Sequence, residues 1–204
     1  MPRNKALGTR RRPYAERKVN VRGTIPRFLI VCEGERTEPN YFERFRVPRD
    51  VVALEVRGIG YNTLSLVREA IKLKDEGDYD QVWCVFDRDS IPAQTFNEAL
   101  RLANQEGIRV AYSNEAFELW YLLHFDFLNT GIRRAAYIAR LTEKIGKRYA
   151  KNSRDMYDIL ESRQQTAIEN AKRLLNIYNL CRPAEDNPST TVHLLVIELL
   201  KFSR

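Results

Sequence analysis

Short apolar runs alternate with helical patterns over the first part of the chain, and this alternation predicts the fold. Four runs of aliphatic and aromatic residues lie at 28–32, 51–56, 81–86 and 108–112. Each has the length of one strand and lacks the alternation of a half-exposed strand, so we expect strands buried on both faces. Between them, apolar residues recur at helical spacing, most clearly over 63–73. This order predicts an α/β fold with a parallel sheet covered by helices on both faces.

After residue 114 the pattern is helical, and no further strand is predicted. Helical spacing covers four later segments, and a shorter helix is predicted earlier in the chain. These helices lie at 40–45, 115–125, 132–148, 155–178 and 189–202. We therefore expect three parts: a basic flexible arm over residues 1–27, an α/β domain over 28–126, and a helical extension over 127–204 that packs on the domain.

Charge is unevenly distributed along the 204 residues, although the net charge is only +7. Residues 1–27 hold nine Lys and Arg against one acid, residues 28–131 hold 11 against 18, and residues 132–173 hold 11 against five. Basic flanks suit a polyanionic partner such as nucleic acid, and clustered acids suit a divalent cation. Basic tails and solvated helix faces are also common without such a partner, so charge alone leaves both interpretations open.

Cysteine usage and hydropathy indicate the compartment. The three cysteines, Cys32, Cys84 and Cys181, are odd in number and lack Cys-x-x-Cys spacing, which argues against a disulfide framework and a zinc site. No apolar run approaches the ~20 residues that a membrane span requires. The first residues lack the apolar stretch of a secretory signal. We expect a soluble cytoplasmic protein that does not contact a membrane.

Acidic residues follow three of the four predicted strands at their carboxyl ends. Glu33 follows the first strand, Asp87 and Asp89 follow the third, and Glu115 follows the fourth. Because parallel strands end at one edge, where α/β proteins bind ligands, we expect these side chains to lie close together. Carboxylate oxygens are the ligands that Mg²⁺ prefers, and a few suffice because the ion retains water. One Asp-x-Asp is common in surface turns, but three converging acidic ends favour a metal site.

The residues around these acids resemble a known family. A strand that ends in Glu-Gly, followed by a later strand that ends in Asp-x-Asp, resembles the TOPRIM domain of topoisomerases, primases and OLD-type nucleases. More narrowly, residues 31–42 (VCEGERTEPNYF) resemble the start of RloB-like proteins, which are also grouped with AbiL-type abortive-infection proteins. Residues 114–125 (NEAFELWYLLHF) and 186–192 (DNPSTTV) extend the resemblance to nearly the whole chain.

The resemblance implies a TOPRIM-like fold and a phosphoryl-transfer site that uses Mg²⁺ or Mn²⁺ in a prokaryotic defence or restriction locus. In that site Glu33 would be a general acid or base, or a metal ligand, and Asp87 and Asp89 would hold the metal. A topoisomerase-type tyrosine domain does not fit in 204 residues, and no primase zinc module is present. Hydrolysis of nucleic acid is the TOPRIM chemistry that remains.

Further acids near these motifs are candidate metal ligands. Glu38 follows Thr37 after the first strand, and this pair is part of the resemblance. Glu115 and Glu118 are three residues apart, so a helix would place them on one face, where they could complete a two-metal site. The alternative for this pair is a favourable contact with the helix start and a surface salt bridge. His124 follows an apolar run and is more simply a core residue.

Basic residues near the motifs and in the helical extension are candidates for contacts with nucleic acid. They are Arg36, Arg88, Lys147, Arg148 and Lys151. The last three surround Tyr149, so the cations could follow a phosphate backbone while the ring stacks on a base. A solvated helix face explains the same stretch nearly as well.

These features predict a metal-dependent nuclease that hydrolyses phosphodiesters. RNA, including tRNA, is preferred over DNA only by analogy with defence effectors of related build. The competing class is a non-catalytic TOPRIM-like regulator that binds nucleic acid or an ATPase partner from the same locus. An intact set of Glu33, Asp87 and Asp89 favours the enzyme, because a pure binder has no need of uncompensated acids beside a polyanion.

Overall fold

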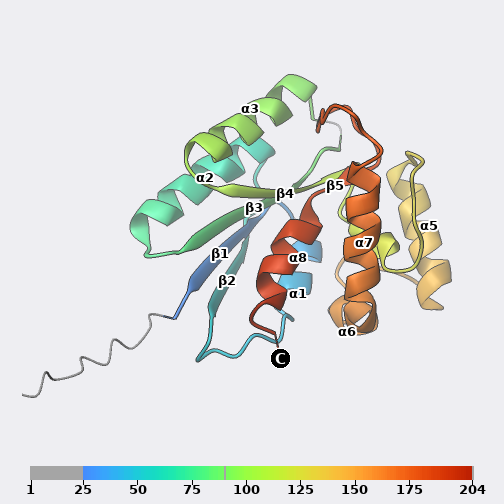
Figure 1. Ribbon diagram of the computed structural model, residues 1–204, viewed down its shortest axis with the longest axis horizontal. Coiled ribbons are helices and arrows are strands. Elements are labelled where there is room, and N and C mark those ends of the chain that lie inside the picture. The colour runs from blue at the N-terminus through green and yellow to red at the C-terminus, as the bar shows by residue number, and fades with distance from the viewer. Residues whose placement is uncertain (1–24, 90, 204) are drawn as a thin grey trace, which may run out of the picture.

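A five-stranded sheet forms the centre of the computed structural model, which describes residues 25–89 and 91–203 (Figure 1). The strands are β1 (Arg27–Cys32), β2 (Ala53–Gly58), β3 (Gln81–Asp87), β4 (Arg109–Asn114) and β5 (Ser189–Thr190). Their order across the sheet is β2-β1-β3-β4-β5, and the first four are parallel. The predicted α/β fold with a parallel sheet is confirmed. Most of the arm predicted over residues 1–27 lies outside the described residues.

The central strands are apolar throughout because helices cover both faces of the sheet. In β1, Phe28, Ile30 and Cys32 belong to one core cluster, and Leu29 and Val31 belong to the other. The second cluster lies under α2 (Thr63–Glu76) and α3 (Ala93–Gln105). The first lies under α1 (Thr37–Phe42), α4 (Glu118–Leu123), α7 (Gln164–Leu175) and α8 (Val192–Leu200). Figure 1 shows these two groups of helices on opposite sides of the sheet.

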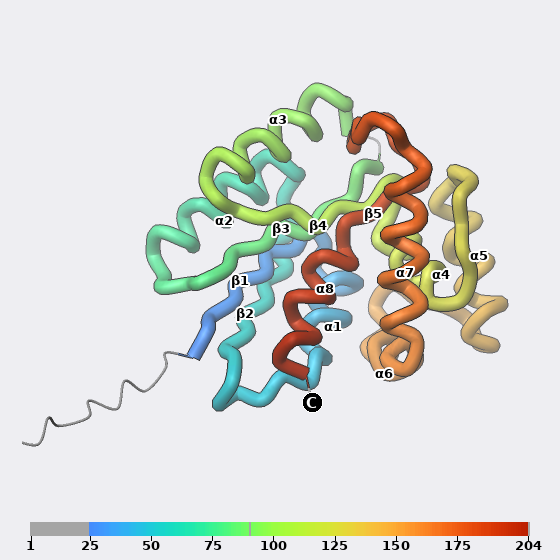
Figure 2. The backbone as a smooth tube through the Cα atoms, in the orientation of Figure 1, coloured from blue at the N-terminus to red at the C-terminus, as the bar shows by residue number. Residues whose placement is uncertain are grey.

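Two helices of the extension lie farther from the sheet. α5 (Arg134–Ile145) packs on α4, and α6 (Met156–Leu160) contacts α1 and continues through a short 3-10 turn, Glu161–Arg163, into α7. The tube in Figure 2 shows α5 beyond α4 and α7. Residues of the extension belong to the same core cluster as β1, so the extension packs on the sheet face; a domain boundary at residue 126 stays a prediction.

Several predicted elements differ from the observed ones. The two-residue β5 pairs antiparallel with Ser113 and Asn114, and the sequence pattern missed it because two residues carry no periodicity. The helix predicted over 189–202 therefore begins only at α8. The helix predicted over 132–148 ends at Ile145 because Gly146 adopts a left-handed φ of 68°, which stops a helix.

Three other helices have shifted or broken ends. The helix predicted over 40–45 is α1 and begins at Thr37, and the helix predicted over 115–125 begins only at Glu118. The helix predicted over 155–178 is interrupted by the 3-10 turn between α6 and α7. No helix among residues 25–89 and 91–203 is both long enough and apolar enough to cross a membrane.

Candidate functional site

The adjacent carboxyl ends of β1 and β3 place Glu33 against Asp87. The ladder between the two strands extends one residue beyond β1, since the Glu33 amide donates to the Val85 carbonyl at 2.9 Å. The Glu33 carboxylate accepts hydrogen bonds from the Asp87 backbone amide at 3.3 Å and from the Thr63 hydroxyl at 3.2 Å. Three elements, the ends of β1 and β3 and the start of α2, therefore fix the orientation of this carboxylate.

Asp87 ends β3, and Asp89 lies in the turn that follows. The Asp87 side chain is buried, and its Oδ1 atom has no hydrogen-bond partner among the described residues. Asp89 is exposed and has a φ of 31°, a sign that Asp tolerates better than most residues. The Arg88 guanidinium holds this turn by donating to the backbone carbonyls of Ala184 at 2.9 Å, Asp89 at 3.1 Å and Ile91.

A hollow of about 350 Å³ joins these residues to acids from two helices. Glu33 and Asp87 line it with Glu38 of α1 and Glu118 of α4, and an adjoining hollow of about 210 Å³ adds Asp89. We call this site the acidic pocket; besides the exposed Glu35, its acids are Glu33, Glu38, Asp87, Asp89 and Glu118. The structure thus brings together five of the six acids that the sequence singled out.

Two of these acids lie deep in the pocket. Glu38 is in the first turn of α1, Glu118 is the first residue of α4, and both are buried. The Tyr149 hydroxyl donates to Glu118 Oε1 at 3.2 Å. A buried carboxylate needs such donors or a cation, because burial disfavours its charged form.

Arg134 is a residue of this site that the sequence patterns did not reveal. It is the first residue of α5, and its Nη1 lies 2.7 Å from Asp89 Oδ2 while its Nη2 lies 3.2 Å from Asp87 Oδ2. In the sequence it is one of 11 basic residues between 132 and 173, and nothing in the local pattern distinguishes it. The packing of α5 on α4 brings it to the pocket.

Burial and mutual repulsion raise the pKa values of three pocket carboxyls. Burial raises the pKa of Asp87 well above its usual range, and the Glu38 and Glu118 carboxylates add to this more than Arg134 opposes it. Burial, helped by Glu118 and Glu33, raises the pKa of Glu38 to about 7. Burial also raises the pKa of Glu33, although its hydrogen bonds from Asp87 and Thr63 oppose the change. The pocket is therefore short of positive charge.

The pocket fits a hard divalent cation in its chemistry but does not surround one. Within the part of the chain that the structure describes, no three Asp, Glu, His or Cys side chains form a group that could hold a metal ion. The Arg134 guanidinium instead bridges Asp87 and Asp89. The donors nevertheless suit Mg²⁺ or Mn²⁺, because all are carboxylate oxygens and the buried Asp87 Oδ1 has no hydrogen-bond partner within residues 25–89 and 91–203.

The raised pKa of Glu38 predicts how the stability of the metal-free protein changes with pH. The folded chain holds this proton more tightly than the unfolded chain, so the stabilisation is present at low pH and is lost as pH rises through about 7. Glu38→Gln should raise the thermal midpoint in chelator at about pH 8.5 and change it little at about pH 4, below the pKa of this carboxyl in the unfolded chain. Glu98→Gln, on the exposed side of α3, is the matched control. An equal effect of Glu38→Gln at both pH values would contradict the burial of an ionised carboxyl.

The structure does not place Glu115 among the acids of the pocket. The sequence predicted Glu115 and Glu118 on one helix face, but α4 begins only at Glu118, so Glu115 precedes the helix. Its side chain lines neither hollow, and its backbone carbonyl accepts a hydrogen bond from the Asp89 amide at 3.2 Å. The prediction that it shares a helix face with Glu118 is therefore wrong.

The predicted nucleic-acid contacts fall into two groups. Arg36 and Lys151 line the acidic pocket, whereas Lys147 forms an ion pair with Asp155 and Arg148 is exposed in the same loop. Arg88 uses its guanidinium on backbone carbonyls, which favours a structural role in the turn after β3.

The stretch around Tyr149 is not a helix face. Residues 146–155 form the loop between α5 and α6, and Tyr149 is buried with its hydroxyl on Glu118. The prediction that its ring stacks on a base is wrong. His124 is a core residue as the sequence favoured, because it is buried and its Nδ1 lies 2.9 Å from the Trp120 carbonyl oxygen.

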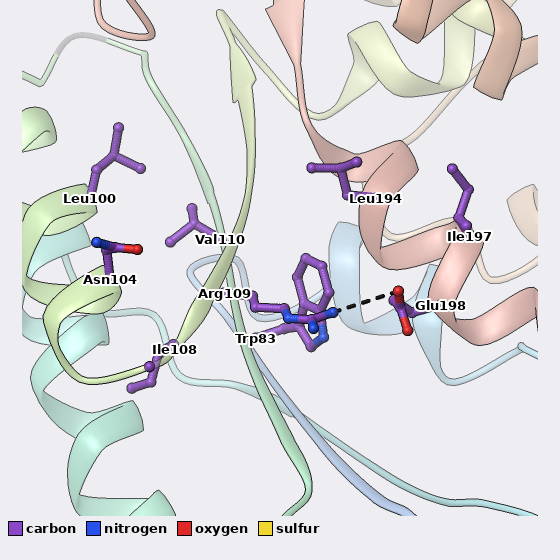
Figure 3. Close-up of a pocket in the computed structure, with 10 residues that line it drawn as sticks. Trp83, Leu100, Asn104, Ile108, Arg109, Val110, Leu194, Ile197 and Glu198 are labelled. Carbon is purple, nitrogen blue, oxygen red and sulfur yellow. Dashed lines mark ion pairs between the residues drawn. The ribbon is translucent and has the colours of Figure 1, made fainter.

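A larger hollow of about 600 Å³ lies at the amino-terminal end of β4, between α3 and α8 (Figure 3). Its walls are mainly apolar and include Leu100, Val110 and Leu194, and an ion pair of 3.6 Å between Arg109 and Glu198 crosses it. Ligands of α/β sheets bind beyond the carboxyl ends of the strands, and this hollow is at the other end. The acidic pocket is therefore the better candidate for chemistry.

This geometry defines a class of protein: an α/β protein with a mostly parallel sheet and with carboxylates that converge at the carboxyl edge of that sheet. The model of the family described as RloB-like protein matches residues 28–199, so the chain belongs to the RloB-like family. No curated protein and no solved structure matches the chain.

Proposed function

We propose that this protein is a metal-dependent nuclease that hydrolyses phosphodiester bonds at the acidic pocket. The observation that carries the proposal is the convergence of Glu33, Asp87 and Asp89 at adjoining strand ends, with a buried Asp87 oxygen that has no hydrogen-bond partner among the residues that the structure describes. An unpartnered buried carboxylate oxygen is costly, and a function that uses it is a physical reason to retain it.

The residues of the pocket divide into distinct roles under this proposal. Asp87 and Asp89 would hold Mg²⁺ or Mn²⁺, with Glu33 or Glu38 as a further ligand. The bound cation would neutralise charge on the phosphate and lower the pKa of a water molecule. Glu33 is suited to proton transfer, because hydrogen bonds fix its carboxylate and burial raises its pKa above the usual value of a glutamate.

Basic residues at the rim would bind the phosphate backbone. The loop that carries Lys151 is fastened to α1, since the Thr37 hydroxyl donates to the Lys151 carbonyl at 2.9 Å and the Asn40 amide donates to the Asn152 carbonyl at 3.3 Å. Lys151 is exposed and lines the pocket with Arg36. This position would let it meet a phosphate next to the scissile one.

Lys151→Ala should weaken nucleic-acid binding by a similar factor for many sequences, because backbone contacts carry no sequence information. It should also reduce the slope of log affinity against log salt by about 1. Fluorescence anisotropy with labelled RNA and DNA in calcium or chelator measures both quantities. Lys72→Ala, which removes an exposed lysine from α2, is the control. An unchanged salt slope would remove Lys151 from the binding surface.

The alternative function is a non-catalytic module that binds nucleic acid or an ATPase partner. One observation favours it: Arg134 already pairs with both aspartates, and no metal-ligand group is formed among the described residues. An aspartate pair that is bridged in this way needs no metal. Nucleic acid that is bound but never cut, with metal having no effect on the protein, would select this function.

The proposal has three further parts. The protein acts in a prokaryotic defence or abortive-infection system, it prefers RNA or tRNA over DNA, and it works with an ATPase partner from the same locus. They rest on membership of the RloB-like family and on the resemblance to TOPRIM nucleases, together with the basic rim. We also propose that the protein acts in the cytoplasm, where its substrates and partner would be.

The test of the proposed function is a cleavage assay with the full chain. Purified protein is incubated with tRNA, total RNA and plasmid DNA, in Mg²⁺, in Mn²⁺ and in chelator, with and without any ATPase that a neighbouring gene encodes. We expect cleavage of RNA in metal and none in chelator. Cleavage of plasmid DNA alone would reverse the substrate preference, and cleavage in chelator would exclude a metal-dependent mechanism.

A further inference from the structure

The Arg134 guanidinium occupies oxygens that a metal ion would use. Its Nη1 and Nη2 atoms contact Oδ2 of Asp89 and Oδ2 of Asp87, at 2.7 Å and 3.2 Å. A cation that binds both aspartates must reach the same pair of carboxylates. The guanidinium and a divalent cation would therefore compete for the same carboxylate oxygens.

The position of Arg134 in α5 is unfavourable for a cation except for these carboxylates. Arg134 is the first residue of the helix, where the helix dipole and the unpaired amides repel positive charge. No side chain caps this helix start. The residue is thus held by the acids of the pocket and not by its own helix.

The ion pair is also incompletely satisfied. Arg134 Nε and Asp87 Oδ1 are both buried and have no hydrogen-bond partner among the described residues. A salt bridge optimised for stability would pair these atoms, since an unmade buried hydrogen bond is costly. The arrangement leaves one aspartate oxygen available while the other is bound.

Release of Arg134 would not disturb the core. α5 is anchored to the rest of the molecule through the buried side chains of Tyr137 and Leu141, whereas the Arg134 side chain is partly exposed. A change of rotamer at the first residue of a helix leaves these contacts in place. The guanidinium can therefore leave the aspartates while α5 stays docked.

We propose that Arg134 is an internal counter-ion that holds the acidic pocket of the metal-free protein and sets its metal affinity by competing with the divalent cation for Asp87 and Asp89. This inference rests on the metal site of the proposed function. Arg134 would then regulate the metal affinity of the pocket. Its guanidinium stabilises the pocket in the absence of metal and must move when metal binds.

The test compares Arg134→Gln with the wild type and with Arg140→Gln, which removes an exposed arginine from the same helix. Mn²⁺ is titrated calorimetrically into the chelator-treated full chain, and thermal midpoints are measured in chelator and in Mn²⁺. Arg134→Gln should bind Mn²⁺ about tenfold more tightly than Arg140→Gln, which corresponds to about 1.4 kcal/mol. Its midpoint in chelator should fall, because the carboxylates lose their counter-ion, and its increase in Mn²⁺ should exceed that of the wild type.

Each other outcome contradicts the inference in a distinguishable way. If Arg134→Gln binds Mn²⁺ with the same dissociation constant as Arg140→Gln, Arg134 only holds the two aspartates and does not compete with the metal. If Arg134→Gln binds Mn²⁺ more weakly, Arg134 helps to form the metal site. In both cases the proposed function stands. No Mn²⁺ binding by either the wild type or Arg134→Gln would overturn the metal site itself. If Arg134→Gln does not fold, Arg134→Lys serves instead, because an ammonium cannot span both aspartates as the guanidinium does. It should bind Mn²⁺ about threefold more tightly than the wild type, and no gain would contradict the inference.

Discussion

Asp87→Asn should abolish metal-dependent stabilisation of the protein and slow cleavage by on the order of 10²–10³-fold or more. The amide removes the negative charge that the metal requires at a buried carboxylate of the pocket. The metal-free protein should keep its fold. Because burial and the Glu38 and Glu118 carboxylates raise the pKa of Asp87, its charged form is disfavoured in the folded state and a neutral side chain costs little.

The measurement is the thermal midpoint in chelator and across a Mn²⁺ series, followed by cleavage rates on the same samples. Asp75→Asn, on the exposed side of α2, makes the same chemical change away from the pocket and should behave like the wild type. A Mn²⁺-dependent rise in the midpoint of Asp87→Asn equal to that of the wild type would place the metal elsewhere.

Glu33→Gln should separate catalysis from metal binding. If Glu33 mainly transfers a proton, its amide should slow cleavage by about 10²–10⁴-fold while retaining more metal binding than Asp87→Asn does. The geometry supports retention of the fold, since the amide oxygen can accept from the Asp87 amide in place of Oε2, and the Thr63 hydroxyl, which now donates to Oε1, can instead accept from the amide nitrogen. Single-turnover cleavage at saturating Mn²⁺ and calorimetric Mn²⁺ affinity test this together, with Glu98→Gln as control. If Glu33→Gln lost as much metal affinity as Asp87→Asn does, the main role of Glu33 would be to bind the metal and not to transfer a proton.

The acids at the carboxyl edge of the sheet could be predicted from the sequence, because their position depends only on the strand that directly precedes each of them. A buried strand is visible as an apolar run, and the residue after the run must lie at the carboxyl edge. Glu33 and Asp87 follow such runs directly, and the parallel register of β1 and β3 brings them into contact. Glu38 was found through a resemblance and Glu118 through its helical spacing from Glu115, which are weaker reasons, and the structure places both in the pocket.

Arg134, Tyr149 and the basic loop could not be placed in the same way. Which of 11 basic residues reaches the pocket depends on how α5 docks on α4, and this depends on long-range packing. Tyr149 was expected to be exposed among cations, but its ring completes the core and its hydroxyl serves Glu118. A helical pattern that runs into a glycine gives no warning that the chain then turns toward α1.

The boundary of the helical pattern also explains the misplaced Glu115. The apolar run from Leu119 onward identifies a helix, but helix starts are set by local contacts that periodicity does not report. Here the chain before α4 leaves β4, pairs with the turn after β3 through the Glu115 carbonyl, and only then turns into the helix. Because the helix begins later than predicted, Glu115 lies outside the pocket, whereas Glu118 lies in it.

The most direct measurement of the central claim is the cleavage of one end-labelled RNA by wild type, Asp87→Asn and Asp89→Asn, each in Mn²⁺ and in chelator. The proposed site requires the wild type to cut the RNA in Mn²⁺ only, and both variants to leave it essentially intact under the same conditions. Cleavage that persists in chelator or in both variants would contradict a metal-dependent nuclease at the acidic pocket. So would RNA that the wild type binds in Mn²⁺, with the proposed ATPase partner added, and does not cut.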